Sequence, residues 1–408
     1  MLNFITGGVC AAQGFRAGGI HVGVKTHAAW KKDVALIVSD EDCACAAVYT
    51  KNAVKAAHIH VDKRHLADGK ARAAVINSGN ANACAPMGEE NAERVCAAAG
   101  KALGCRPEDV VVAATGVIGQ TLNVAVIEQG MPELCAAAAH TAAGSDAAAH
   151  AIMTTDTVKK ELAVETVIGG KTVRMGGIAK GSGMIHPNMG TMLCFLTTDC
   201  AISSEMIKSA LLETVQASFN RISVDGDTST NDTCCVLANG LAGNPVITEK
   251  GPDYDAFVEA LRALCVELAK KMASDGEGAT HLITCTVTGA GSEQSAETVA
   301  KSVIGSALTK AAIFGADANW GRVLCAMGYS KAPFRPEYVD ISFSSAVGAV
   351  AVCRGGMGLD FDEEAARSIL SQDEVVIDVH LHEGEHEATC WGCDLTYEYV
   401  KINGDYRT

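Results

Sequence analysis

The sequence predicts a mixed α/β fold, because strand-like and helix-like hydrophobic patterns both recur along it. The chain has 408 residues, of which 48% are hydrophobic and 20% are charged. This composition is sufficient for sizeable buried cores, and the length suggests two or three domains. A globular protein is therefore expected rather than a disordered one.

Apolar runs mark the clearest strands. Residues 164–168 and 172–175 alternate in polarity and are joined across a Gly-Gly pair, which is typical of a tight hairpin. Residues 110–113 and 192–196 are short apolar runs of the kind found in buried strands. The hairpin leads into a glycine-rich loop, and the run 192–196 follows that loop.

Helical spacing is clearest in residues 257–272, where apolar residues recur every three or four positions. An acidic residue near the start of this segment and lysines near its end favour the helix dipole. The alanine-rich run 134–152 also predicts a helix, and residues 363–370 show similar apolar spacing. We expect the last two segments to be structural.

The carboxyl-terminal part predicts a half-exposed antiparallel strand pair. Apolar and polar residues alternate over 377–382, and residues 395–402 suggest a strand that returns beside them. The sequence contains no Pro-rich linker and no convincing repeat, so the end of the helix and its loop set the boundary. We expect a larger domain over residues 1–280 and a smaller one over 281–408.

Charge and hydropathy narrow the classes of partner. The formal net charge is −15, and no long Lys/Arg run is present that could neutralise a phosphate backbone, so nucleic acid is not expected. No apolar segment reaches the length of a membrane span, and the amino terminus lacks the pattern of a secretory signal. A cytoplasmic protein is expected, with its 17 cysteines as reduced thiols.

The segment from Lys180 to Asp199 carries the most chemical information. Its glycine-rich loop ends at Gly190, and Thr191 stands at the head of the apolar run. The hydroxyl of Thr191 can attack the Gly190 carbonyl, and hydrolysis of the resulting ester would leave Thr191 with a free α-amine as its own general base. Thr191 is therefore a candidate nucleophile, although a purely structural threonine at a strand entrance is the alternative.

This segment resembles the self-cleavage signature of the ornithine acetyltransferases, the ArgJ family. Five further segments resemble parts of that family in the same order, so the resemblance covers essentially the whole chain. They are Ala114–Gly119, Thr154–Asp156, Asp275–Thr280, Asp317–Arg322 and Tyr399–Thr408. The resemblance implies an ArgJ/DmpA-like N-terminal-nucleophile fold with mixed α/β layers, a smaller α/β carboxyl-terminal domain, and an active site between the domains.

The resemblance also implies roles for individual residues. Family positions that match this chain place Thr115 and Gly116 in the oxyanion hole, and Thr191 and Glu277 in catalysis. The implied substrate-binding residues are Thr154, Lys180, Thr191, Glu277, Asn403 and Thr408. Thr155 remains an alternative to Thr154, and the chain departs from the common family pattern at His281, Gly404 and Arg407.

The implied activity is transfer of an acetyl group from N2-acetyl-L-ornithine to L-glutamate through acetyl-Thr191, in arginine biosynthesis. Cleavage between Gly190 and Thr191 would yield an α piece, 1–190, and a β piece, 191–408, in an α2β2 assembly. Acetyl-CoA is a candidate co-substrate, and no cofactor is expected. The alternative is an amidohydrolase or aminopeptidase of related N-terminal-nucleophile design, in which water is the acceptor.

Other motifs predict little binding chemistry. Polar segment 223–233 resembles a calcium loop only superficially, because its carboxylate spacing fails the EF-hand pattern; support of the active site is expected instead. The glycine-rich loops match neither phosphate-binding fingerprint. A metal-like cluster includes a Cys-x-x-Cys pair, but it lacks a second such pair, so no metal site is expected. Its members are His380, His382, His386, Cys390 and Cys393.

Overall fold

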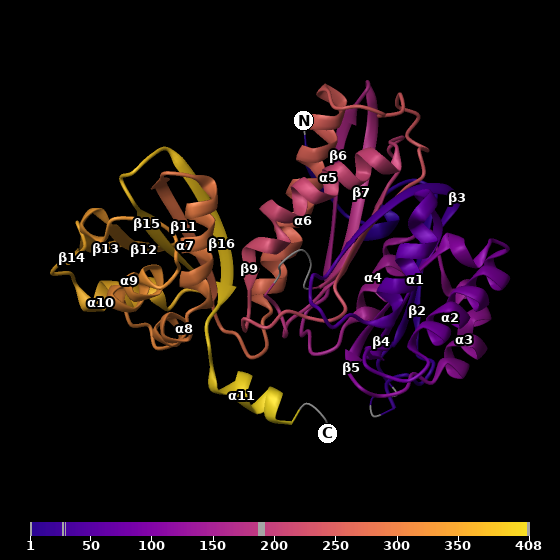
Figure 1. Cartoon of the computed structure of the whole chain (residues 1–408), viewed down its shortest axis with the longest axis horizontal. Helices are drawn as coiled ribbons and strands as arrows, with labels where there is room; N and C mark the ends of the chain where they lie inside the picture. The colour runs from indigo at the N-terminus through magenta and orange to yellow at the C-terminus, as the bar shows by residue number, and fades with distance from the viewer. Residues whose placement is uncertain (1, 27, 29, 187–191, 406–408) are drawn as a thin grey trace. The chain divides into compact units, whose positions relative to one another are not determined.

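A computed structural model describes residues 2–26, 28, 30–186 and 192–405 of the chain (Figure 1). These residues form two compact units. Unit 1 contains the described residues of 1–181, 187–220 and 228–269, and unit 2 contains those of 182–186, 221–227 and 270–408. Within the described part of the chain, no helix has the length and apolar character that crossing a membrane requires.

Unit 1 is built on a nine-stranded sheet in which most neighbours are antiparallel and two pairs, β8–β10 and β4–β5, are parallel. Eight strands follow one path across the sheet, and β2 (Phe15–Ile20) pairs with β3. In order across the sheet, the eight are β1 (Asn3–Ile5), β6 (Lys160–Ile168), β7 (Lys171–Lys180), β8 (Leu193–Thr198), β10 (Thr233–Ala238), β3 (Val34–Tyr49), β4 (Lys70–Asn80) and β5 (Val110–Val117).

Helices cover both faces of the β3–β4–β5 part of this sheet. On β3, Ala35 and Ile37 pack with residues of α4, whereas Val34 and Leu36 pack with residues of α2 and α3. Strands buried on both faces read as continuous apolar runs, which is why this segment has no polar alternation. The helices that lie in unit 1 are α1 (Ala57–His65), α2 (Gly88–Leu103), α3 (Val124–Ala137), α4 (Ala142–Ile152) and α5 (Ser204–Ala217).

Unit 2 is built on a seven-stranded sheet in which β11 pairs in parallel with β15 and β9 pairs in parallel with β16. In order, its strands are β14 (Met357–Gly358), β13 (Gly348–Arg354), β12 (Asp340–Ser345), β15 (Glu374–His380), β11 (Leu282–Ala290), β16 (His386–Cys393) and β9 (Ile222–Ser223). Its helices are α7 (Glu293–Gly305), α8 (Ala307–Phe314), α9 (Trp320–Gly328), α10 (Glu363–Leu370) and α11 (Tyr397–Gly404). The predicted mixed α/β class is confirmed.

Several sequence-based elements are confirmed in detail. The predicted hairpin is β6–β7, and its two-residue turn has Gly169 and Gly170 at φ 55° and 75°, the left-handed conformations that such a turn requires. The helix expected over 257–272 is α6 (Pro252–Ser274), and the one over 363–370 is α10. The predicted domain limits, 1–280 and 281–408, stay a prediction, because compact units need not be independently folding domains.

The single helix predicted over 134–152 is wrong. The chain leaves α3 after Ala137 and enters α4 at Ala142, and between them the backbone of Ala139 exchanges two hydrogen bonds with Ala17. The side chain of Thr141 then caps α4 by accepting from the Gly144 N–H at 3.1 Å. Pairing with Ala17 and this cap override the helical propensity of the alanines.

The returning strand predicted over 395–402 is also wrong. That segment contains α11, whose Tyr397 and Val400 are 84% and 69% exposed, so its apolar residues do not mark a buried strand face. The returning strand is β16, which occupies the side of β11 opposite β15. Strand β15 itself pairs antiparallel with β12.

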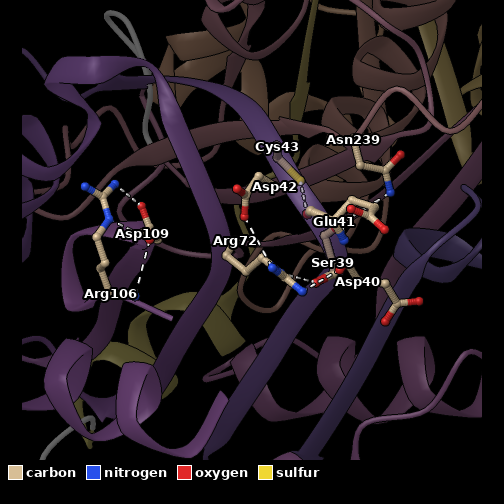
Figure 2. A network of polar contacts seen from close by, with 9 residues as sticks. All are labelled: Ser39, Asp40, Glu41, Asp42, Cys43, Arg72, Arg106, Asp109 and Asn239. Atoms are coloured by element: carbon tan, nitrogen blue, oxygen red, sulfur yellow. Dashed lines mark hydrogen bonds and ion pairs between the residues drawn. The ribbon is translucent and has the colours of Figure 1, made fainter. Parts of the chain in front are cut away.

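An acidic bulge, residues 39–42, interrupts the pairing of β3 with β4, because Val38 faces Ala73 while Cys43 faces Ala71. Arg72 of β4 holds the bulge, as Figure 2 shows: its guanidinium donates to the carbonyls of Ser39, at 2.8 Å, and Asp40. It also donates to the Asp42 carboxylate at 3.3 Å. One side chain therefore satisfies two backbone acceptors that the ladder leaves open.

We expect Arg72→Met to lower the free energy of unfolding by about 1–2 kcal/mol, because two carbonyls of the bulge lose their donor. Urea denaturation measures this loss. Arg106→Met is the matched control, since the Arg106 guanidinium pairs with the carboxylates of Asp109, which Figure 2 also shows, and Asp68, and not with backbone carbonyls among the described contacts. A loss for Arg72→Met no larger than that of the control would contradict the assignment.

Candidate active site

The first group of predicted site residues lies in unit 1. Thr115 is on β5 and Lys180 is the last residue of β7, and the Lys180 ammonium donates to the Thr115 hydroxyl at 3.5 Å. Both residues are buried, with 9% and 8% of their surface exposed. The structure therefore brings together a hydroxyl and a cation that are 65 residues apart in sequence.

Gly116 follows Thr115 and has a φ of 128°, in the region that favours glycine. It faces Gly79 across the parallel β4–β5 pair, and a Cβ on Gly116 would collide with the Gly79 carbonyl group. Asn231 holds the preceding residue, because its side-chain amide donates to the carbonyls of Ala114 at 2.7 Å and Ala81 at 2.6 Å. Thr115 and Gly116, both within β5, are thus fixed by a glycine contact and by a buried amide.

Asp156 is the buried anion of this group. The sequence predicted no role for it beyond its place in the segment Thr154–Asp156. Its carboxylate accepts from the backbone N–H groups of Thr154, at 3.0 Å, and Gly181, at 2.8 Å. It lies 2.6 Å from the Lys160 ammonium and 4.0 Å from that of Lys180. Burial raises the pKa of Asp156, but the charges of Lys180 and Lys160 prevail and hold it well below its ordinary value.

Lys25 is a further cation that sequence reasoning missed. Its ammonium donates to the carbonyls of Met153 and Lys32, each at 2.8 Å, and its side chain packs against Gly79. Burial lowers the pKa of Lys25 to about 8, against the opposing charge of Asp33. A lone lysine in a loop carries no sequence signal for this position.

The second group of predicted site residues lies in unit 2. Asn403 of α11 donates to the Glu277 carboxylate at 2.7 Å, and this helix replaces the strand predicted for the residues just before Asn403. The Glu277 side chain packs against Gly183, where any Cβ would collide with the carboxylate. The Glu277 N–H donates to the Ser182 carbonyl at 2.8 Å, so backbone and side chain are both held by the segment 182–186.

The predicted set is thus described as two groups. Thr115, Gly116, Thr154 and Lys180 are gathered in unit 1, and Glu277 and Asn403 are joined in unit 2. Gly190, Thr191 and Thr408 lie outside the described residues. Their roles as cleavage site, nucleophile and substrate contact stay predictions.

Asp232 is a second buried carboxylate that sequence reasoning missed. It precedes β10, where the Thr233 N–H donates to the Met192 carbonyl at 2.9 Å. Burial raises the pKa of Asp232 well above its ordinary value, and its Oδ2 has no hydrogen-bond partner within the described ranges. The sequence predicts only a supporting role for the polar segment 223–233. The spacing of its carboxylates does not distinguish Asp232 from the other acidic residues of the segment.

The metal-like cluster has another explanation in the structure. Cys390 and Cys393 are three residues apart on β16, so they lie on opposite faces of the sheet. The Cys390 thiol donates to the Glu297 carbonyl, and Cys393 lies 3.7 Å from the Lys310 ammonium. Across the residues that the structure describes, no three His, Cys, Asp or Glu side chains are placed to hold a metal ion.

Taken with the fold, the buried lysine beside the Thr-Gly pair of β5 defines a candidate acyl-transfer enzyme. Residues 16–408 match the ArgJ family, so the chain belongs to the ArgJ family. By that membership it is an acetyltransferase of arginine biosynthesis.

Relatives match the chain along its length. It is 51% identical over all of its 408 residues to the arginine biosynthesis bifunctional protein ArgJ of Symbiobacterium thermophilum, covering 100% of that protein. It is 46% identical over 98% of its length to ArgJ of Geobacillus kaustophilus, covering 96% of that protein.

Two solved structures are also similar to parts of the chain. ArgJ from Bacillus halodurans is 46% identical, covers 51% of this chain and 96% of its own, and has a TM-score of 0.48. Ornithine acetyltransferase from Mycobacterium tuberculosis, solved in complex with ornithine, is 36% identical, covers 46% of this chain and 100% of its own, and has a TM-score of 0.43.

We expect Asn231→Ala to lower the free energy of unfolding by about 2–3 kcal/mol, because two buried carbonyls lose their donor. Urea denaturation provides the measurement. Asn239→Ala is the matched control: the Asn239 amide also donates twice, to the Gln13 carbonyl and the Ser39 hydroxyl, but in a more exposed setting. Equal losses for the two variants would contradict the claim that burial makes the two hydrogen bonds of Asn231 contribute more to stability.

Stability should also fall in mild acid because of His58. This residue of α1 is fully buried beside the Thr233 hydroxyl, at 3.2 Å, and burial lowers its pKa from 6.5 to about 4. Between these values the unfolded chain binds the proton and the native state does not. The stability that a neutral, buried His58 contributes is therefore fully present above about pH 6.5. It is lost as the pH falls to about 4, and the total loss is about 3 kcal/mol.

Urea denaturation between pH 4 and 7 checks this dependence. His58→Gln should reduce the slope of the unfolding free energy against pH by the amount that corresponds to about one proton. The slope that remains includes the contribution of His186, because burial also lowers the pKa of His186 to about 4. His150→Gln, on an exposed part of α4, is the matched control for the substitution itself, and it should change the slope less than His58→Gln does. An unchanged slope in His58→Gln would refute the assignment.

Proposed function

We propose that this chain moves an acetyl group from N2-acetyl-L-ornithine to L-glutamate through an acetyl-Thr191 intermediate. Family membership along the whole chain supports the reaction class. The observation that carries the proposal is the buried contact between Lys180 and Thr115, next to Gly116, because it gathers a cation and oxyanion donors at one place.

The proposed first half-reaction begins with attack of the Thr191 hydroxyl on the acetyl carbonyl carbon, while the α-amine of Thr191 takes the hydroxyl proton. The Thr115 hydroxyl and the Gly116 N–H stabilise the tetrahedral oxyanion. As the oxyanion collapses, the C–N bond to ornithine breaks and the departing amine takes the proton. Ornithine leaves, and Thr191 carries the acetyl ester.

The second half-reaction repeats these steps with glutamate. Its α-amine attacks the acetyl ester, a proton passes back to the Thr191 oxygen, and N-acetylglutamate leaves. Lys180 and Thr154 would bind the substrate carboxylate, and Glu277, Asn403 and Thr408 would bind the remaining part of the amino acid. Glu277 and Asn403 already form a hydrogen-bonded pair, which suits recognition of an ammonium group.

The nucleophile requires a free amine, so we further propose that the chain cleaves itself between Gly190 and Thr191. The two pieces, 1–190 and 191–408, remain associated, and two copies of each form an α2β2 assembly. The reaction as written needs no cofactor, and acetyl-CoA is a candidate second acetyl donor. We place the enzyme in the cytoplasm, where its amino-acid substrates are made.

Denaturing intact-mass analysis of the wild type beside Thr191→Ala tests the proposal. The wild type should give two pieces that divide before Thr191, and N-acetylornithine should add one acetyl group to the 191–408 piece. Thr191→Ala should stay one chain without acetyl. Thr155→Ala is a control that should still be cut.

One uncut and unacetylated wild-type chain would overturn the proposal. Acetate released in the absence of glutamate would instead favour the alternative amidohydrolase, in which water accepts the acetyl group. Initial-rate kinetics distinguish the mechanisms further, because the acetyl-enzyme scheme requires ping-pong behaviour.

A further inference from the structure

Three buried charged side chains form a linear cluster in unit 1. The Asp156 carboxylate lies between two ammonium groups, that of Lys160 at 2.6 Å and that of Lys180 at 4.0 Å. The side chains of Lys160 and Asp156 are 1% and 0% exposed, and that of Lys180 is 10% exposed. Of the three, the cation proposed to meet the substrate has the greatest access to solvent.

Two ammonium groups face one carboxylate in this cluster. Lys25 and Asp232 also act on Lys180: the Lys25 ammonium adds positive charge near it, and burial of the Asp232 carboxyl favours the neutral form of that group. Asp156, fully buried and ionised, is the carboxylate that both ammonium groups of the cluster face.

A lysine that binds a substrate carboxylate must meet two opposing requirements. A lysine on a flexible stem needs a fixed partner to hold it in place, and an anion that holds it also competes with the substrate for its charge. Asp156 is well fixed, because backbone N–H groups of Thr154 and Gly181 bind its two oxygens. Lys160, at the shorter distance, offsets the charge of that anion.

We propose that Asp156 and Lys160 are positioning residues for substrate recognition: Asp156 places the Lys180 ammonium, and Lys160 offsets Asp156 so that the cluster still attracts the substrate carboxylate. The inference rests on the proposed function, and it adds two residues to the site that act through Lys180. Neither residue needs to touch the substrate.

Paired substrates separate this role from a structural one. N-acetylputrescine is N-acetylornithine without the α-carboxylate, so it reports on the same acetyl transfer without carboxylate recognition. Lys160→Met keeps an unbranched side chain that is one atom shorter and removes its charge. We expect it to lower kcat/KM for N-acetylornithine about tenfold, mainly through KM, and to change kcat/KM for N-acetylputrescine less than about twofold.

Removing both charges of the Asp156–Lys160 pair should restore part of the recognition. The double variant Asp156→Asn/Lys160→Met replaces the ion pair by a neutral pair of similar size. Its kcat/KM for N-acetylornithine should recover to about threefold below the wild type but not fully, because the Asp156 charge that places Lys180 is also gone. Lys159→Met is the matched control, because Lys159 neighbours Lys160 in sequence but pairs with Asp146 and Glu161 at the surface. This control should leave both substrates unaffected.

Calorimetric binding of ornithine and putrescine gives the same comparison without turnover. Lys160→Met should weaken ornithine binding about tenfold and leave putrescine binding unchanged. Equal losses for ornithine and putrescine, or no recovery in the double variant, would overturn the inference. A wild type that binds ornithine selectively but transfers no acetyl group would contradict the proposed function and leave the charge argument standing.

Discussion

The close approach of Gly79 and Gly116 is the constraint on which the rest of the unit 1 site depends. Strands β4 and β5 can converge there because Gly116, at a φ of 128°, has no side chain to collide with the Gly79 carbonyl group, and the missing side chain of Gly79 leaves room for Lys25. Thr115 precedes this contact, Lys25 packs on the far side of Gly79, and Asn231 holds Ala114. A single methyl group at Gly116 would therefore collide with the backbone of Gly79 and Asn80, which lies beside these three contacts.

The sequence predicted correctly those elements that depend on residues close together in the chain. The hairpin β6–β7 follows from its Gly-Gly turn, and α6 follows from apolar spacing over more than four turns. The break between α3 and α4 could not be predicted in this way, because its cause is the pairing of Ala139 with Ala17. The helix α11 was missed because a short apolar alternation resembles a strand when burial is unknown.

The same distinction applies to the site. Thr115, Lys180, Glu277 and Asn403 were predicted because they lie in segments that resemble a family. The structure adds contacts that join them in pairs. Asp156, Lys160 and Lys25 could not be assigned roles from sequence, because their importance lies in burial and in distances between charges. Such quantities have no counterpart in residue spacing.

The strand order of the unit 1 sheet has a consequence for how the protein is made. Strands β8 and β10 follow residue 191, yet they lie between β7 and β3, which both precede residue 190. A cut at that point would leave the first piece with two separate blocks of strands and the second with the two strands that bridge them. Neither fragment could complete this sheet alone. Each half, if made separately, would therefore have to find the other before the sheet could form. The uncut polypeptide would serve as its own assembly template, and backbone ladders on both sides of the inserted strands would then keep the halves together.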